Sequence, residues 1–396
     1  MAEYKILEYD YGFFINNYVG NYKMREYQGE KCIVSDEYFN EGNNKTELKI
    51  KEIFVDEYKE NQYVVMKLSK IDIKNDNQII EFCNTYGLPF SSVTITDNIE
   101  ENTKIRRLYD CIIEDTHPFY HRDCMTREDF CKYVVSARSY LTLLSELKSK
   151  TPDMKKLICS LLHILIFERI WDKCFNDLEE HINYTLTGQF RLNLQYEEFD
   201  ALHSGSVDKI LNALSEFCKR TSKKSEELRN YSDNILAFIS KLMSYIEQNG
   251  YSISIDENYD MTSENKFAYN QELKQIACKI SSIVLADSIT EGIANVRQVM
   301  YPNINEKSKF RAIHKYRYMY EGIYQELFLL CTNGERIHKC QNVTCNKYFI
   351  SNTNRKKFCS HQCATTVAKR RQRERDQADP DRERQEPGFR GRKSKS

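Results

Sequence analysis

Four cysteines near the C-terminus occur as two close pairs, in the pattern C-x4-C-x13-C-x3-C. The first pair is Cys340 and Cys345, and the second pair is Cys359 and Cys363. Four thiolates can surround one Zn²⁺ ion tetrahedrally, and pairing the ligands in sequence lets each pair bind from a single tight turn or helix start. No open coordination position is suggested, so the sequence predicts one structural zinc ion held by these four residues.

The residues around the pairs predict how this finger is built. Residues 347–350 (KYFI) predict a short strand and residues 351–356 a polar turn, after which the chain returns to the second pair, so that the metal closes a β-hairpin. Ser360 is placed to cap a helix that starts at the second pair. This order of elements resembles a treble-clef finger. His338 and His361 lie beside the pairs and could replace a cysteine, although four thiolates make the simpler site.

Eight basic side chains cluster around the predicted finger. They are Arg355, Lys356, Lys357, Lys369, Arg370, Arg371, Arg373 and Arg375. Three lie on the predicted turn and five on the predicted helix, where they form a compact cationic surface for phosphates. The five helical positions are spread around most of the helix circumference, so their side chains cannot all face one groove. A solvated charged helix without a partner is the alternative interpretation.

Charge is distributed unevenly along the chain, whose formal net charge is zero. Residues 335–396 hold 17 Lys or Arg against 7 Asp or Glu, a net charge of +10, and the other 334 residues therefore carry −10. An acidic body with a basic end is expected of a chain that presents one segment to a polyanion. A solvated tail, or a tail that docks on the body, would give the same asymmetry.

The elements that must position the finger begin with β-rich segments. Residues 30–39, 46–58 and 63–73 are β-branched and aromatic runs of strand length, separated by turn-forming residues, and they predict a small N-terminal antiparallel sheet. Residues 75–89 predict one short helix that stops at Gly87.

Helical patterns dominate from about residue 126. Thr126 precedes Asp129 by three residues, a variant of the capping box, and apolar residues then recur at alternate spacings of four and three. Further helical patterns are predicted at 154–184, 206–221, 224–249, 264–298 and 307–333, with a break expected within 264–298. The predicted fold class is therefore α+β and mainly α, with no fixed-period repeat.

Four regions follow from these patterns. They are a β-rich region at 1–73, a large helical domain at 74–334, a four-cysteine zinc finger with its basic helix at 335–376, and a disordered basic tail at 377–396.

Targeting, membrane and catalytic signals are absent or weak in the sequence. The N-terminus shows no leader pattern, and the most apolar stretch, 157–167, is too short for a membrane span, so we expect a cytoplasmic protein with no membrane partner. No nucleotide-binding or hydrolase motif is present. His117, His121 and Cys124 have a spacing that metal or nucleophile chemistry could use, but no partner is evident, and His163 is expected in the core. The chain is therefore not expected to be an enzyme.

The C-terminal segment GERIHKCQNVTCNKYFISNTNRKKFCSHQCATTVAKRRQRER resembles the zinc finger of bacterial CGNR-type proteins. The shared features are a Gly before a basic lead-in, two cysteine pairs, an aromatic strand, a basic turn and an Arg-rich helix. Upstream, EFCNTYGLP is similar to a helix end in the ABATE region that accompanies such fingers. Ala364, Thr365 and Thr366 stand where that family has Gly-Asn-Arg, and the last spacing is shorter than in its usual form. The Cys-Ser-x-x-Cys spacing also occurs in MYND-like fingers, which bind proteins.

The resemblance implies a stress-responsive transcription regulator with a nucleic-acid-binding finger and a regulatory helical body. We therefore expect a nucleic-acid-binding regulatory protein whose basic helix contacts DNA in preference to RNA. The alternatives are a module whose MYND-like finger docks another protein, and a stress- or phage-response protein that binds RNA. The sequence predicts neither the oligomeric state nor the signal that the helical domain senses.

Overall fold

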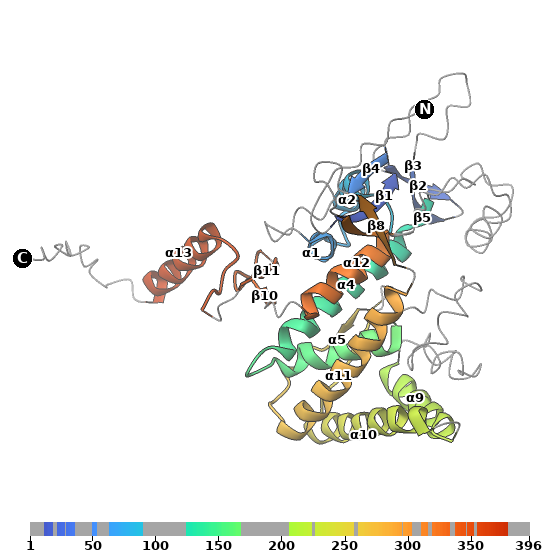
Figure 1. Ribbon diagram of the computed structural model, residues 1–396. Coiled ribbons are helices and arrows are strands. Elements are labelled where there is room, and N and C mark those ends of the chain that lie inside the picture. The colour runs from blue at the N-terminus through green and yellow to red at the C-terminus, as the bar shows by residue number, and fades with distance from the viewer. Residues whose placement is uncertain are drawn as a thin grey trace, which may run out of the picture.

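The computed structural model describes residues 12–18, 22–27, 29–35, 50–53, 63–89, 124–167, 206–223, 226–256, 260–294, 296–302, 310–315, 319–332, 337–345, 347–351 and 355–378. Across these residues the fold is α+β and mainly α, as predicted, with small sheets and a C-terminal cysteine cluster. Figure 1 shows the four-stranded and three-stranded sheets at one end of the helical body and the C-terminal helix set apart to one side. The boundaries of the four predicted regions stay a prediction.

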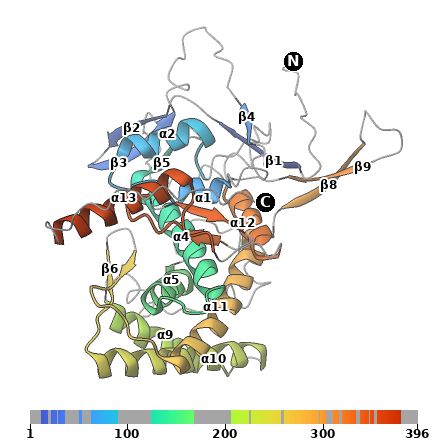
Figure 2. The same cartoon turned by 90° about the vertical axis from the view of Figure 1, so that its left-hand side faces the viewer.

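The helical body is built from long helices whose apolar faces pack together. Its helices are α4 (Arg127–Leu147), α5 (Met154–Phe167), α9 (Val207–Thr221), α10 (Glu226–Asn249), α11 (Gln271–Gly292) and α12 (Met319–Thr332). The helix α11 contacts α4, α5, α10 and α12, and α9 pairs with α10 at the far end from the sheets (Figures 1 and 2). The apolar face predicted for α4 is buried, since Phe130, Val134 and Leu141 have no exposed area. Burying each such side chain contributes roughly 1.5–3 kcal/mol.

Local hydrogen bonds start and stop the helices where the sequence predicts. Thr126 caps α4, because its hydroxyl oxygen accepts from the backbone N–H of Asp129 at 3.1 Å and its hydroxyl donates to the Asp129 carboxylate at 2.8 Å. Asn75 caps α2 (Asp76–Tyr86) by accepting from the Asn77 N–H at 3.1 Å. Gly87 ends α2 at φ 82°, a left-handed value that glycine adopts without strain.

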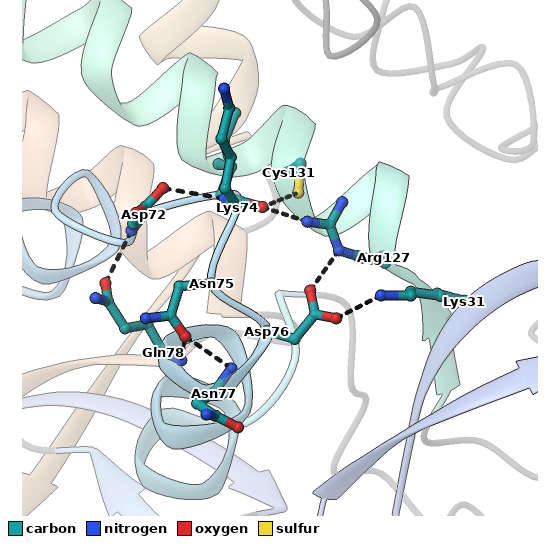
Figure 3. Close-up of polar contacts among 10 residues, drawn as sticks. Lys31, Asp72, Lys74, Asn75, Asp76, Asn77, Gln78, Arg127 and Cys131 are labelled. Carbon is teal, nitrogen blue, oxygen red and sulfur yellow. Dashed lines mark hydrogen bonds and ion pairs between the residues drawn. The ribbon is translucent and has the colours of Figure 1, made fainter.

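Asp76 ties three elements together beside this cap (Figure 3). Its Oδ1 accepts from Nε of Arg127 on α4 at 2.7 Å, and its Oδ2 pairs with Nζ of Lys31 on β3 (Glu30–Ser35) at 2.7 Å. These hydrogen bonds, from Lys31 first and then Arg127, lower the pKa of Asp76 below its usual value. Arg127 also donates to the backbone carbonyl of Ile73. The start of α2 is thereby fastened to both a strand and a long helix.

The strand predicted at 63–73 is wrong, because this segment contains the helix α1 (Val64–Leu68). Its β-branched residues favour a strand locally, but a carboxylate from a distant part of the chain caps the helix. The two carboxylate oxygens of Glu326, on α12, accept from the backbone N–H groups of Val64 at 2.9 Å and Val65 at 2.8 Å. A tertiary contact therefore overrides the local preference.

The helices predicted at 264–298 and 307–333 are too long, because α11 covers only Gln271–Gly292 of the first range and α12 covers only Met319–Thr332 of the second. The chain instead forms β8 (Arg297–Pro302) and β9 (Phe310–Lys315), which pair antiparallel between α11 and α12. Strand β9 also pairs in parallel with β1 (Gly12–Tyr18), which gives a sheet of order β4-β1-β9-β8 with β4 at Ile50–Ile53. The N-terminal strands thus find partners from much later in the chain, which a local pattern does not reveal.

A second sheet has the order β2-β3-β5, with β2 at Tyr22–Tyr27 and β5 at Cys124–Thr126. All of its pairs are antiparallel, but the predicted segments 30–39 and 46–58 do not share one sheet, because β3 lies in this sheet and β4 in the first. A third sheet is the small hairpin of β6 (Ser254–Ile255) and β7 (Met261–Thr262). The predicted helix 154–184 is confirmed as far as Phe167, and residues 168–184 lie outside the described ranges.

Candidate metal centre

The four paired cysteines meet at one point, as their spacing predicts. Their Sγ atoms all lie within 4.8 Å of one another, and the Cys345–Cys359 and Cys359–Cys363 sulfur distances are 3.5 and 3.6 Å. Metal–thiolate bonds of about 2.3 Å in a tetrahedron place sulfurs about 3.8 Å apart, so the cluster is close to the size that one ion requires. Neither His338 nor His361 belongs to this cluster of described residues. The donor set is therefore four thiols that could hold one metal ion.

The first pair lies on a tight turn between two short strands. These strands, β10 (Ile337–Lys339) and β11 (Tyr348–Ile350), pair antiparallel, and the backbone N–H of Cys340 donates to the Lys347 carbonyl at 2.8 Å. Inside the turn, the N–H of Cys345 donates to the Asn342 carbonyl at 2.9 Å. The two thiols therefore project from one compact loop.

The predicted hairpin needs one correction. The strand at 348–350 is present, but its partner is β10, which precedes the first cysteine pair, and not the segment that returns to the second pair. That returning segment is joined to the loop by one backbone hydrogen bond of 3.0 Å, from the Gln341 N–H to the Lys357 carbonyl. The strand at 337–339 has only three residues, which is too short for an alternating pattern to be recognised in sequence.

The second pair lies at the start of the helix α13 (His361–Ala378). The Ser360 hydroxyl accepts from the N–H of Cys363 at 3.2 Å, so Ser360 caps the helix as predicted. Cys359 precedes the cap and Cys363 lies in the first turn, which brings both thiols to the same end of α13. A metal at this point would therefore fix the direction in which α13 leaves the finger.

The thiols have different proton affinities. Hydrogen bonds, from the Asn342 side chain first and then from Ser360, lower the pKa of Cys363 to about 6. Burial raises the pKa of Cys345 to about 12 and also raises the pKa of Cys359. Only thiolates bind a metal, so an incoming ion must displace protons from the thiols with the higher pKa values. Asn342, a residue 5% exposed, is not singled out by the sequence, where its one signal is its position in the turn after Cys340.

The finger is packed on the helical body through its two strands. Ile337, Tyr348 and Ile350 belong to the same apolar core as the body helices. The Tyr348 hydroxyl lies 2.6 Å from the Thr142 hydroxyl on α4, and burial raises the pKa of Tyr348. The cysteine cluster is thus held against the body on one side, while α13 extends away on the other (Figure 1).

The predicted basic residues occupy two neighbouring surfaces. Arg355, Lys356 and Lys357 are exposed on the segment before the second cysteine pair, where Lys356 lies over the Phe349 ring at 5.5 Å. On α13, Lys369, Arg371, Arg373 and Arg375 are exposed, and Arg370 is partly buried with its Nε 3.8 Å from the Glu374 carboxylate. The helical period places Lys369 with Arg373 on one row and Arg371 with Arg375 on nearly the opposite row. The five helical cations therefore do not share one face, as the sequence indicates.

Two other predicted positions can be placed. His163 is buried in the core, with Nε2 3.1 Å from the Ser136 hydroxyl, as predicted. Cys124 is the first residue of β5, whereas His117 and His121 lie outside the described residues.

Comparisons with known proteins identify no relative: the chain matches no family model, no curated protein and no solved structure. No family match therefore supports the resemblance to CGNR-type fingers. The structure shows an α+β, mainly α chain with four cysteines placed to form a potential metal centre. No helix within the described ranges has both the length and the apolar character that crossing a bilayer needs.

Proposed function

We propose that this chain is a nucleic-acid-binding regulatory protein, in which one structural Zn²⁺ ion orients a basic helix toward phosphates. The observation that carries the proposal is the position of the four-thiol cluster at the start of α13, whose exposed surface bears lysines and arginines. Zinc is the ion we assign, because a closed tetrahedral set of four thiolates is its usual structural site. The same residues are the basis for assigning a CGNR-type finger of a bacterial transcription regulator.

Charge supports DNA as the partner. The exposed cations on α13 and on residues 355–357 lie at the basic end of a chain whose remainder carries a net charge of −10. Phosphates would be repelled by the acidic body and attracted to the finger, which confines contact to one part of the molecule. We place DNA ahead of RNA, since a fixed, straight helix suits a duplex groove.

The function can be tested by the salt dependence of binding. We expect the full-length, zinc-loaded protein to bind a fluorescent DNA duplex with a log–log slope of about −3 to −5 against salt, as for about four to six neutralised phosphates. Lys369→Gln combined with Arg373→Gln removes two cations from one row of α13. The log–log slope should then become less negative by about 2.

A matched control keeps the same change in charge away from the finger. Lys209→Gln combined with Lys279→Gln removes two exposed cations from α9 and α11, and it should leave the slope unchanged. Equal loss of affinity in both double variants, or no binding to the duplex at low salt, would contradict the proposal. Tighter binding to a single-stranded or duplex RNA of the same sequence would contradict the preference for DNA.

A protein partner for the finger is the second candidate. Val343, in the turn that holds the first cysteine pair, is 68% exposed and offers an apolar contact at the surface of the finger. A finger that docks a protein through this turn would show little salt dependence, and Val343→Asp would weaken it without affecting zinc content. The proposed DNA contact, in contrast, is expected to survive loss of this apolar side chain.

A further inference from the structure

A cavity lies where the finger meets the helical body. Its volume is about 550 Å³, within the range of about 300–1,000 Å³ that small-molecule sites occupy. The helices α4 and α5, the turn after α1 and the strand β7 supply most of its wall. The finger closes it with Lys339 at the end of β10 and Tyr348 at the start of β11. The wall is therefore complete only while the finger is docked on the body.

Positive charge dominates the wall. The described lining residues include five cations, Lys70, Arg138, Lys155, Lys156 and Lys339, against two carboxylates, Asp72 and Asp260. Lys156 is paired with Asp153, at 2.8 Å, outside the wall. Within the described part of the chain, neither Lys70 nor Lys339 has a carboxylate within ion-pair distance. An excess of positive charge around a hollow raises the local concentration of anions.

Among the residues that the structure describes, Arg138 likewise has no carboxylate within ion-pair distance. Its Nε donates to the Ser69 carbonyl at 2.9 Å, and a terminal nitrogen donates to the Ile71 carbonyl. These carbonyls hold the guanidinium in a fixed orientation at the wall of the cavity without neutralising its charge. A guanidinium with remaining N–H donors is well suited to phosphate oxygens.

The two carboxylates oppose an anion only weakly. Asp72 is exposed, and its Oδ1 already accepts from the Lys74 backbone N–H at 3.0 Å. Burial, and then the neighbouring Asp256, raise the pKa of Asp260 above its usual value. Hydroxyl groups complete the wall, among them Thr142 and Tyr348. The cavity thus combines five cationic side chains with two carboxylates and several hydroxyl groups.

We propose that this cavity binds a small phosphorylated ligand, of the pyrophosphate or nucleoside diphosphate class, and that the ligand bridges the finger and the helical body. Lys339 would reach the phosphates from the finger, while Lys70 and Arg138 reach them from the body. Because the ligand binds only the docked arrangement, it stabilises that arrangement by mass action. This inference goes beyond the proposed function, and it can be tested without nucleic acid.

Calorimetric titration of the full-length, zinc-loaded protein tests the site. The probes are sodium pyrophosphate and adenosine diphosphate, with sodium sulfate at equal ionic strength as the comparison anion. We expect one pyrophosphate or adenosine diphosphate per chain and at least tenfold weaker binding of sulfate. Lys70→Gln and Lys339→Gln should each lower the affinity for the phosphorylated probes at least tenfold. Lys279→Gln, a matched change on α11, should leave that affinity unchanged.

The two cavity variants lie on separate elements, so misfolding of one would leave the other informative, and a thermal melt and zinc analysis check both. Hydrogen exchange provides a second measurement: the probe should slow exchange of the β10 and β11 amides at least several-fold. No binding of either probe at millimolar concentration would overturn the proposal, as would unchanged exchange in those strands.

Variants of α13 separate this inference from the proposed function. The Lys369→Gln, Arg373→Gln protein should keep full affinity for pyrophosphate, even where its binding to DNA is weakened. An equal loss of pyrophosphate binding in this protein would show that the anion binds the basic helix and would overturn the cavity site. If Lys70→Gln abolishes DNA binding while the small probes do not bind at all, the cavity receives a nucleic-acid phosphate, and the small-ligand proposal is wrong.

Discussion

The helical body and the C-terminal finger are stabilised in different ways. The body has a continuous apolar core, with large side chains such as Phe130, Phe217 and Phe238 fully buried. Of the described finger residues, Ile337, Tyr348 and Ile350 join that core, whereas Cys340, Phe349 and Val367 are buried outside it. A segment with so little apolar interior of its own would gain most of its order from a metal bound by the four thiols. The comparison indicates that metal removal and core mutation should damage different parts of the molecule.

The largest expected effect is the loss of Cys359, one of the four proposed metal ligands. Cys359→Ser removes one of four thiolates and should release the metal, because binding free energies of about 10–16 kcal/mol at structural zinc sites depend on the full ligand set. Limited proteolysis should then cut within 337–378, while the body still unfolds in one cooperative transition. Mass spectrometry of the fragments and elemental analysis measure both results.

Cys278→Ser is the matched control for this variant, since Cys278 is a partly buried free cysteine on α11 and not a member of the cluster. It should keep one metal ion per chain and an intact finger. Metal content that stays at one per chain in Cys359→Ser would show that the ligand set is wrong.

A smaller effect is expected from a mutation in the core of the helical body, which should change global stability and not the finger. Leu141→Ala leaves a cavity at a fully buried position on α4 and should lower the free energy of unfolding by about 2–5 kcal/mol. Chemical denaturation monitored by circular dichroism measures this loss. The metal content should remain unchanged, and a loss of metal comparable to that of Cys359→Ser would contradict the separation between the two regions.

The contact between the finger and the body should contribute less free energy than a buried core side chain. Tyr348→Phe removes the hydroxyl that lies 2.6 Å from Thr142 and should weaken docking of the finger by about 1 kcal/mol, the usual net value of such a hydrogen bond. Hydrogen exchange of the β10 and β11 amides should accelerate about fivefold, while global stability changes little. Unchanged exchange would mean that this hydrogen bond does not hold the finger.

The smallest predicted effect depends on pH. The hydrogen bonds from Lys31 and Arg127 lower the folded-state pKa of Asp76, so the charged carboxylate stabilises the fold at pH values above its unfolded pKa of about 3.9. This stabilisation is lost as the pH falls through the lower folded-state value. Asp76→Asn should therefore lower the free energy of unfolding by about 0.5–1 kcal/mol at pH 7, and by progressively less below pH 4. The effect is small because the ion pairs are partly solvated. A cost that is independent of pH would contradict this origin.

Local features of the fold could be predicted from the sequence. The caps at Thr126, Asn75 and Ser360, and the stop at Gly87, depend on neighbouring residues within one turn, so their chemistry is visible in the printed order. The cysteine cluster could also be predicted, because paired ligands limit how four thiols can meet.

Features that depend on distant partners could not be predicted. Val64 and Val65 favour a strand by residue type, and only the carboxylate of Glu326 explains why they form a helix. The parallel pairing of β1 with β9 joins residues about 300 positions apart. The cavity is likewise assembled from separate elements, so no local pattern of Lys70, Arg138 and Lys339 indicates it.

The central claim is that a single ion bound by four thiolates organises the finger. X-ray absorption at the zinc edge, on reduced full-length protein with its metal content measured in the same sample, tests it most directly. We predict one zinc per chain with four sulfur neighbours at about 2.3 Å. A zinc content far below one per chain, or a coordination shell that contains nitrogen or oxygen neighbours at about 2.0 Å, would contradict the claim.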